Sequence, residues 1–152
     1  MPPAAGLHID TPRADDRTAW EALYRGFRDF YRLAENPQAI DTVWGWVVRP
    51  GGPLEGRVAR TDAGALVALM HFREVPRPFH GVMGGYLDEL FIADSARGEG
   101  IADAMMDALH AIGVERGWRD VRWITSDSNA RSCAFYDRVS KRTKFVTYEI
   151  RF

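Results

Sequence analysis

The sequence contains a single cysteine, Cys133, among 152 residues. One cysteine cannot form a disulfide within the chain, so a reducing compartment, the cytoplasm, is the default expectation. The four histidines lack the spacing of zinc ligands, and we expect no metal site. No apolar run approaches the length of a membrane-spanning helix, and residues 1–6 resemble no signal peptide. These absences predict a cytoplasmic protein without a membrane partner.

The chain also has no large excess of positive or negative charge, because 20 basic and 21 acidic residues leave a formal net charge of −1. This balance gives no reason to expect a nucleic acid or an anionic membrane as a partner. The Walker phosphate-binding pattern and the Gly-x-Ser-x-Gly elbow of serine hydrolases are absent from the sequence. At 46% hydrophobic and 27% charged residues, the chain has the composition of a soluble globular protein. Its length fits one domain over residues 1–152 with its own core.

The pattern of apolar residues predicts alternating strands and helices. A first helix is expected to start at a capping box at Thr18, although Asp15 or Asp16 could cap it instead. A second helix is expected from Asn36-Pro37, where a cap residue precedes a proline in the first turn. A third helix is expected from Gly98 and a fourth over 129–139. Strands are expected over 7–10, 57–60, 65–72, 86–92, 121–125 and 145–151. The Pro- and Gly-rich stretch 75–85 is expected to be a loop. This order favours a mixed α/β sheet flanked by helices.

The most informative stretch runs from Tyr86 to Ala102. An apolar strand interrupted by Asp88 and Glu89 leads into Arg97-Gly98-Glu99-Gly100-Ile101-Ala102, which opens a helix. Acids within a buried strand are costly unless they have a partner or a task. A glycine-rich loop at a helix start presents free backbone N–H groups and the positive end of the helix dipole, which is typical of a phosphate site. The alternative is a tight turn that binds nothing.

This stretch resembles the GCN5-related N-acetyltransferase (GNAT) family. Arg97-x-x-Gly100-x-Ala102 is similar to the family's pyrophosphate loop, and Leu87 to Ile92 is similar to its central strand. Asn129 to Tyr136 keeps the spacing of its Asn-x-x-Ala-x-x-Leu/Phe-Tyr motif. The resemblance implies a mixed, mostly antiparallel sheet flanked by four helices, with acetyl-CoA as cosubstrate. Members often have two strands after the last helix, whereas this chain has room for one.

The resemblance implies that acetyl-CoA lies along the central strand and the loop. The strand is expected to be splayed from its neighbour so that its backbone can pair with the pantetheine chain. Glu99 and Asp103 would bring negative charge near the phosphates, from which we expect modest affinity. The implied cofactor-binding residues are Leu90, Phe91, Ile92, Arg97, Gly98, Glu99, Gly100, Ile101, Ala102, Asp103, Asn129, Ser132 and Tyr136.

Tyr136 stands where the family has its general acid. A phenol with an ordinary pKa near 10 is protonated at pH 7 and can donate to a leaving thiolate. The alternative is a core tyrosine on a short amphipathic helix. Asn129 is expected to hydrogen-bond the cofactor, to cap the helix, or both. Cys133 is interpreted as a packing residue.

Asp88 and Glu89 are the candidates for the general base, and strand alternation predicts that they point to opposite faces. A carboxylate can take the proton of an ammonium group and hold the cation before transfer. Polyamine-type members carry Leu-Glu-Asp-Ile-Tyr-Val at this strand, which favours Asp88 as base and Glu89 as an acceptor or structural contact. The two roles remain interchangeable on sequence alone. The alternative is a salt bridge to Arg122 or another arginine.

The acceptor site is expected between the first two helices, the loop after them and the central strand. Aromatic side chains near a carboxylate suit an organic cation, although aromatics at helical spacing are more often core. The candidate residues are Asp88, Tyr24, Phe27, Tyr31, Trp44, Trp46, Phe79 and His80.

Taken together, the sequence predicts acetyl transfer from acetyl-CoA to a primary amine, of a small molecule or lysine-like, by direct attack in a ternary complex. A non-catalytic acyl-CoA-binding or regulatory domain is the alternative. A dinucleotide-binding domain is disfavoured because Asp103 stands where the third small residue should be. A homodimer is a further expectation, since a single last strand would leave an exposed sheet edge.

Overall fold

A computed structural model of the chain describes residues 6–152, so the expectation about the signal peptide falls mainly outside the described residues. A five-stranded sheet in the order β1-β2-β3-β4-β5 runs through the molecule. Its strands are β1 (Leu7–Asp10), β2 (Glu55–Thr61), β3 (Leu66–Arg77), β4 (Val82–Ile92) and β5 (Val121–Arg122). The first three pairings are antiparallel and β4 pairs with β5 in parallel, which confirms the mixed, mostly antiparallel sheet.

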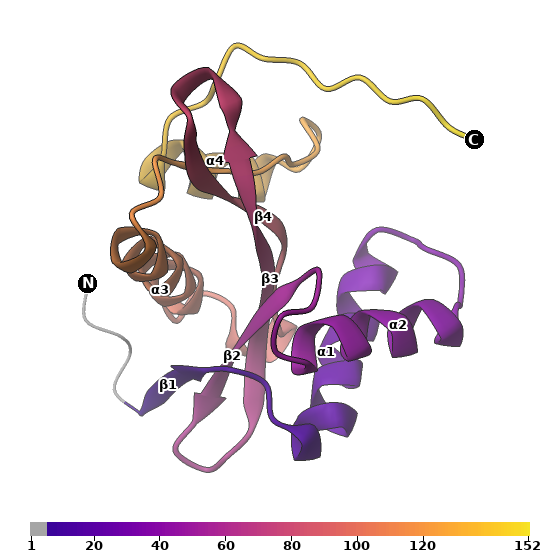
Figure 1. Cartoon of the computed structure of the whole chain (residues 1–152). Helices are drawn as coiled ribbons and strands as arrows, with labels where there is room; N and C mark the ends of the chain where they lie inside the picture. The colour runs from indigo at the N-terminus through magenta and orange to yellow at the C-terminus, as the bar shows by residue number, and fades with distance from the viewer. Residues whose placement is uncertain (1–5) are drawn as a thin grey trace.

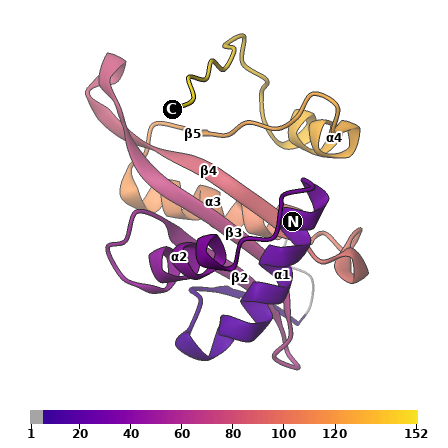
Figure 2. The same cartoon turned by 90° about the vertical axis from the view of Figure 1, so that its right-hand side faces the viewer.

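Four helices flank the sheet: α1 (Arg17–Phe30), α2 (Pro37–Val48), α3 (Ile101–Arg116) and α4 (Ala130–Val139). Helices α1 and α2 cover one face and α3 covers the other (Figures 1 and 2). Asn36 caps α2 as expected, accepting the Ala39 N–H at 3.0 Å. The predicted capping box at Thr18 is wrong, because α1 begins at Arg17 with Asp16 at the N-cap position. The Asp16 carboxylate accepts hydrogen bonds from the Arg13 N–H and the Arg60 guanidinium and does not cap the helix.

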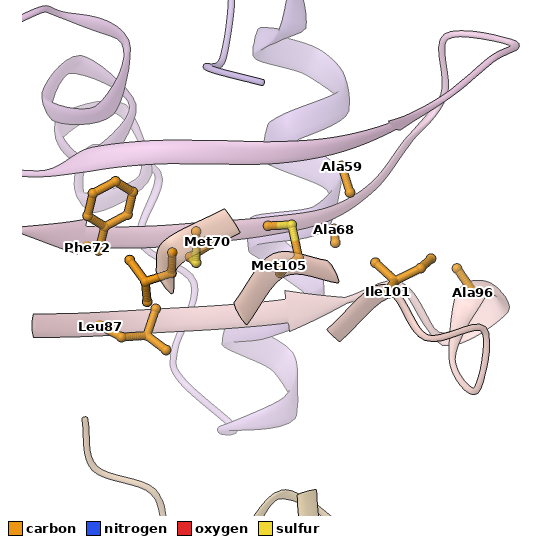
Figure 3. Close-up of a cluster of buried hydrophobic side chains, with 9 residues drawn as sticks. Ala59, Ala68, Met70, Phe72, Leu87, Ala96, Ile101 and Met105 are labelled. Atoms are coloured by element: carbon orange, nitrogen blue, oxygen red, sulfur yellow. The ribbon is translucent and has the colours of Figure 1, made fainter. Parts of the chain in front are cut away.

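Each face of the sheet has its own apolar core. Figure 3 shows the α3 side, where Met105 and Ile101 meet side chains of the central strands such as Met70, Phe72 and Leu87. On the other side, Trp20 of α1 is fully buried against Leu69 and Ile40. The two cores fix both helical layers to the sheet, whose strand β4 carries the predicted site residues Asp88 to Ile92.

The stretch 75–85 is not the loop that its prolines and glycines indicate. Strands β3 and β4 continue as a hairpin to Arg77 and Val82, closed by a short 3-10 helix, Pro78–His80. The β2–β3 ladder ends at Phe72, so the part of β3 that contains Pro76 pairs with β4 alone. Proline has no N–H to donate, and it is tolerated there because it can face the open edge of β3. Gly85 is required for packing: a Cβ there would lie 2.4 Å from the Trp118 ring.

Two expected strands differ at the end of the chain. The strand over 121–125 shortens to Val121–Arg122, because β4 and β5 diverge after two paired residues. The expected last strand, 145–151, forms no ladder in the described chain and runs outward as an extended segment (Figures 1 and 2). A strand exists only where a neighbouring strand accepts its hydrogen bonds, and local β propensity cannot supply that neighbour.

Candidate active site

A cavity of about 920 Å³ opens where β4 and β5 diverge. Its walls come from the end of α1, from β4, from the loop and first turn of α3, from the segment after β5 and from α4. The cavity brings together most of the residues that the sequence singled out. Those lining it are Phe27, Tyr31, Asp88, Glu89, Leu90, Phe91, Ile92, Arg97, Gly98, Gly100, Ile101, Ala102, Asp103, Asn129, Ser132 and Tyr136.

The glycine-rich loop brings open backbone donors to one end of the cavity. Gly98 and Gly100 have φ values of +83° and +75°, which side-chain-bearing residues rarely adopt. Gly100 is the N-cap of α3 and supplies no side-chain cap, so the first N–H groups of the helix remain available for an anion. Arg97, the first residue of the loop, forms an ion pair with Asp94 at 2.6 Å. Its guanidinium carbon lies 5.9 Å from the centroid of the Phe91 ring. These features fit a pyrophosphate.

The two acids near the loop lie in different surroundings. Asp103 receives two hydrogen bonds from the Arg138 guanidinium of α4, at 2.8 and 3.0 Å. This arginine holds the pKa of Asp103 below its ordinary value and balances its charge. Glu99 is exposed and is not among the residues that line the cavity. The negative charge expected at the phosphate end therefore falls mainly on Glu99.

The outer edge of β4 is open along the cavity. Pairing with β5 consists of Gly85 with Val121 and Tyr86 with Arg122, and within residues 6–152 no strand pairs with this edge beyond Tyr86. Backbone N–H and C=O groups on an unpaired edge need partners. The splayed geometry that the sequence resemblance implied is thus present, and it can receive the amides of a pantetheine chain.

Tyr136 lies on α4, on the far wall of the cavity. Its ring packs at 5.3 Å from the rings of both Trp123 and Phe135. Burial, together with the nearby Tyr31 hydroxyl, raises the pKa of Tyr136 to about 12. The hydroxyl is therefore protonated at neutral pH and able to donate a proton into the cavity. Asn129 caps α4, accepting the Ser132 N–H at 3.1 Å.

A β-bulge sets the directions of the two candidate bases. His71 pairs with Glu89 and the next residue, Phe72, pairs with Leu87, so Asp88 is the extra residue of β4. Asp88 forms an ion pair with Arg73 at 3.0 Å, rather than with Arg122. Burial raises the pKa of Asp88, although Arg73 acts in the opposite direction. The bulge places both acids at the cavity instead of on alternate faces.

Glu89 is held by side chains that the sequence argument assigned elsewhere or missed. Its Oε2 lies 2.5 Å from Nδ1 of His71, and its Oε1 accepts the Tyr24 hydroxyl at 3.2 Å. Nε2 of His71 accepts the Trp20 N–H at 3.1 Å, and both of these side chains are fully buried. The spacing of the histidines does not indicate the role of His71, because its partners Trp20 and Glu89 are remote from it in the sequence. An apolar strand interrupted by histidine, opposite another interrupted by an acid, could have indicated the pair.

The aromatic candidates separate into two groups. Phe27 and Tyr31 line the cavity. Tyr24 is not among the lining residues, but its hydroxyl donates a hydrogen bond to Glu89, which lines the cavity. Trp44 packs 5.1 Å from Trp20 in the core. Trp46, Phe79 and His80 are not among the lining residues, and Phe79 is 95% exposed at the hairpin tip. Sequence reasoning missed several lining residues, which are Phe30, Leu33, Leu87, Ala96, Trp123, Ile124, Thr125, Ser126, Arg131, Phe135 and Arg138.

Two absences hold for residues 6–152. No group of three or more histidine, cysteine, aspartate or glutamate side chains in this range is placed to bind a metal ion. No helix in this range is both long and apolar enough to cross a membrane.

Known structures share this architecture. A ribosomal-protein-alanine N-acetyltransferase from Brucella melitensis biovar Abortus 2308 superposes with a TM-score of 0.81 at 23% identity, covering 96% of this chain and 99% of that one. AAC(6')-Iy in complex with the bisubstrate analogue CoA-S-monomethyl-acetylneamine superposes with a TM-score of 0.80 at 16% identity, covering 96% and 98%. At these identities the likeness shows the fold.

The sequence comparisons add the family. A D-amino-acid N-acetyltransferase of Saccharomyces cerevisiae, HPA3, is 24% identical over 135 residues, which is 88% of this chain and 84% of that protein. The model of the acetyltransferase (GNAT) family matches residues 20–140, which contain the glycine loop, the open β4 edge and Tyr136. The chain therefore belongs to the GNAT family and is an acetyl-CoA-dependent N-acetyltransferase.

Proposed function

We propose that the protein acetylates a primary amine of a small molecule by direct attack of the amine on acetyl-CoA in a ternary complex. The observation that carries the proposal is the pair of carboxylates, Asp88 and Glu89, at the cavity beside aromatic side chains. An alkylamine is a cation at neutral pH, and anionic and aromatic groups together bind cations. The D-amino-acid substrate named for the yeast relative also carries a primary amine.

The proposed chemistry divides the roles among three side chains. Glu89 holds the ammonium group, and Asp88, whose pKa is raised by burial, takes its proton, directly or through water. The amine nitrogen then forms a bond to the acetyl carbonyl carbon, and the carbon–sulfur bond breaks. The departing thiolate takes the proton of the Tyr136 hydroxyl. The products are the N-acetylated amine and CoA.

Acetyl-CoA is proposed to bind at the residues that line the phosphate end and the open strand edge. The loop from Arg97 to Ala102 and the first turn of α3 would receive the pyrophosphate. The backbone of Leu90 to Ile92 would pair with the pantetheine chain, and Asn129 and Ser132 would contact it from α4. Because Asp103 is balanced by Arg138, Glu99 is the acid that we expect to weaken this binding.

The test is release of CoA thiol from acetyl-CoA with a matched panel of acceptors. A primary alkylamine, a free amino acid and a lysine-containing peptide present the same reacting group on different bodies. We expect saturable release of CoA thiol with at least one small amine. We expect Glu89→Gln to raise the KM for that amine at least tenfold, since a charge-assisted contact is lost. Binding of acetyl-CoA without release for any amine would favour the acyl-CoA-binding domain instead.

We further propose that two copies of the chain associate through residues 145–152, named here the C-terminal arm. Five large apolar residues of the arm, Phe145, Val146, Tyr148, Ile150 and Phe152, are each at least 71% exposed. The arm starts beside β5, with the Arg122 guanidinium 5.9 Å from the Phe145 ring, and β5 ends the sheet with an unpaired edge. Exposed β-forming residues and an open edge suit reciprocal addition of each arm to the sheet of a second copy.

Light scattering after size exclusion tests this association. We expect the intact chain to have the mass of a dimer and Tyr148→Asp, in the arm, to have the mass of a monomer. Val114→Asp is the matched control, since Val114 is also an exposed apolar residue, 68% accessible on α3. A monomeric intact chain, or a dimer that Tyr148→Asp leaves unchanged, would contradict the proposal. The free thiol of Cys133 is consistent with the cytoplasm as the proposed location.

A further inference from the structure

His71 is a fully buried titratable side chain directly behind the cavity, and the proposed chemistry does not use it. It stands in the middle of a chain of hydrogen bonds that begins at Trp20 on α1, crosses β3 and ends on Glu89 of β4. Tyr24, one turn after Trp20, donates to the other oxygen of the same carboxylate. We propose that Trp20 and His71 are positioning residues that keep Glu89 anionic and directed at the amine.

The donor inventory determines where the imidazole proton lies. The indole nitrogen of Trp20 can only donate, so Nε2 of His71 must offer its lone pair at 3.1 Å. A neutral imidazole then carries its proton on Nδ1 and donates it to Oε2 of Glu89 at 2.5 Å. A second proton on His71 would set two N–H groups against each other. Trp20 therefore fixes both the tautomer and the neutral state of His71.

The neutral state of His71 has a consequence for the charge at the cavity. With its proton on Nδ1, His71 donates to one oxygen of Glu89 and the Tyr24 hydroxyl donates to the other, and these two donors favour the anionic carboxylate. An imidazolium in the same place would cancel this charge by forming an ion pair. A neutral imidazole orients the carboxylate but leaves its negative charge to the incoming ammonium group.

The charged side chains on the elements around His71 have other partners. On β4, Asp88 is paired with Arg73 of β3. On α1, Arg28 faces the Tyr24 hydroxyl, and Arg17 lies over the Trp20 ring at 5.6 Å. On the β2 side, the residue paired with His71 is Gly56, which has no side chain to ionise. Trp20 is thus the group that decides whether Nε2 can take a proton.

The experiment compares Trp20→Phe with the double variant Trp20→Phe/His71→Asn. Phenylalanine removes the N–H donor, so Nε2 of His71 is no longer held as an acceptor and can take a proton. Asparagine can keep an N–H donor toward Glu89 but cannot become a cation. The readout is the KM for the amine between pH 6 and pH 8, divided by the wild-type value at each pH so that titration of the amine itself cancels.

For Trp20→Phe we expect this KM ratio to rise about tenfold from pH 8 to pH 6, because an imidazolium would neutralise the Glu89 contact. The double variant should show a ratio that does not change with pH. The Kd for acetyl-CoA should stay near wild type in both variants. A KM ratio independent of pH in Trp20→Phe, or the same acid-side rise in the double variant, would overturn the inference.

A measurement on the unaltered protein covers the case in which the buried substitution prevents folding. Nitrogen chemical shifts of His71 should show a neutral ring protonated at Nδ1 throughout pH 6–8. An imidazolium at pH 6, or a proton on Nε2, would contradict the inference. The inference rests on the proposed function, but the two fail differently: a wild-type protein without thiol release overturns the function, whereas these shifts test the hydrogen-bond chain itself.

Discussion

The two sides of the cavity present polar groups of different kinds. On the side proposed for acetyl-CoA the main groups are backbone: the N–H groups after Gly100 and the unpaired edge of β4. On the side proposed for the acceptor they are side chains in pairs, Glu89 with His71 and Asp88 with Arg73. Backbone groups are fixed by the fold and tolerate sequence change, which suits a ligand common to a family. Side-chain pairs can be exchanged one residue at a time, which suits an acceptor that varies between members.

Tyr136 on α4 lines the same cavity, and loss of its hydroxyl should give the largest effect. We expect Tyr136→Phe to lower kcat by about 10²–10⁴, because the thiolate would leave without its proton donor. Titration calorimetry should find the Kd for acetyl-CoA close to wild type, since the ring remains in place. Phe135→Leu, on the same helix, is a control for packing. A kcat within twofold of wild type would exclude Tyr136 as the acid.

Asp88→Asn should break the acceptor side alone. We expect kcat/KM to fall about 10²-fold at neutral pH, since a general base is lost. The raised pKa of Asp88 also gives a pH signature: as the pH falls through that pKa, the wild type loses its base form. The wild-type profile should therefore steepen on the acid side by one unit of log rate per pH unit beyond the titration of the amine.

In Asp88→Asn the additional steepening of the pH–rate profile on the acid side should be absent. Rate measurements of both proteins across pH 4–8 will check this. If the variant kept the wild-type profile, Asp88 would be no more than the partner of Arg73.

Gly100→Ala should disturb the cofactor side alone. At φ +75° an added side chain costs roughly 1–2 kcal/mol of folding stability, and its Cβ would stand beside the proposed phosphate position. We expect the Kd for acetyl-CoA to rise about tenfold. Gly64→Ala is a matched control, because Gly64 has a similar φ of +86° and open space in the β2–β3 turn. Equal Kd changes in the two variants would show that the effect is strain and not contact.

Glu99→Gln should give the smallest effect and refine the comparison. Glu99 is exposed, so its repulsion of the phosphates is screened by water and salt. We expect the Kd for acetyl-CoA to fall about two- to threefold in low-salt calorimetry and to equal wild type in high salt. An unchanged Kd at low salt would mean that this charge does not reach the ligand.

The same contrast explains what the sequence could predict. The cofactor side is encoded in contiguous stretches, such as Arg97 to Ala102, whose glycines have a direct structural meaning. The acceptor side depends on contacts between distant residues, such as Trp20 with His71, 51 positions apart. It also depends on the bulge at Asp88, which strand alternation cannot predict. The expected last strand over 145–151 is wrong for the same reason, because its β-forming residues pair with no other strand in residues 6–152.

The most direct test of the account is amine binding to protein saturated with CoA, a product that cannot transfer an acetyl group. Calorimetry would measure the Kd of a primary alkylamine for wild type and Glu89→Gln, together with the Kd of CoA for each. The account predicts that Glu89→Gln weakens the amine at least tenfold and leaves CoA within twofold. Equal amine affinity in the two proteins, or a parallel loss of CoA, would contradict the division of the cavity into a backbone side and a side-chain side.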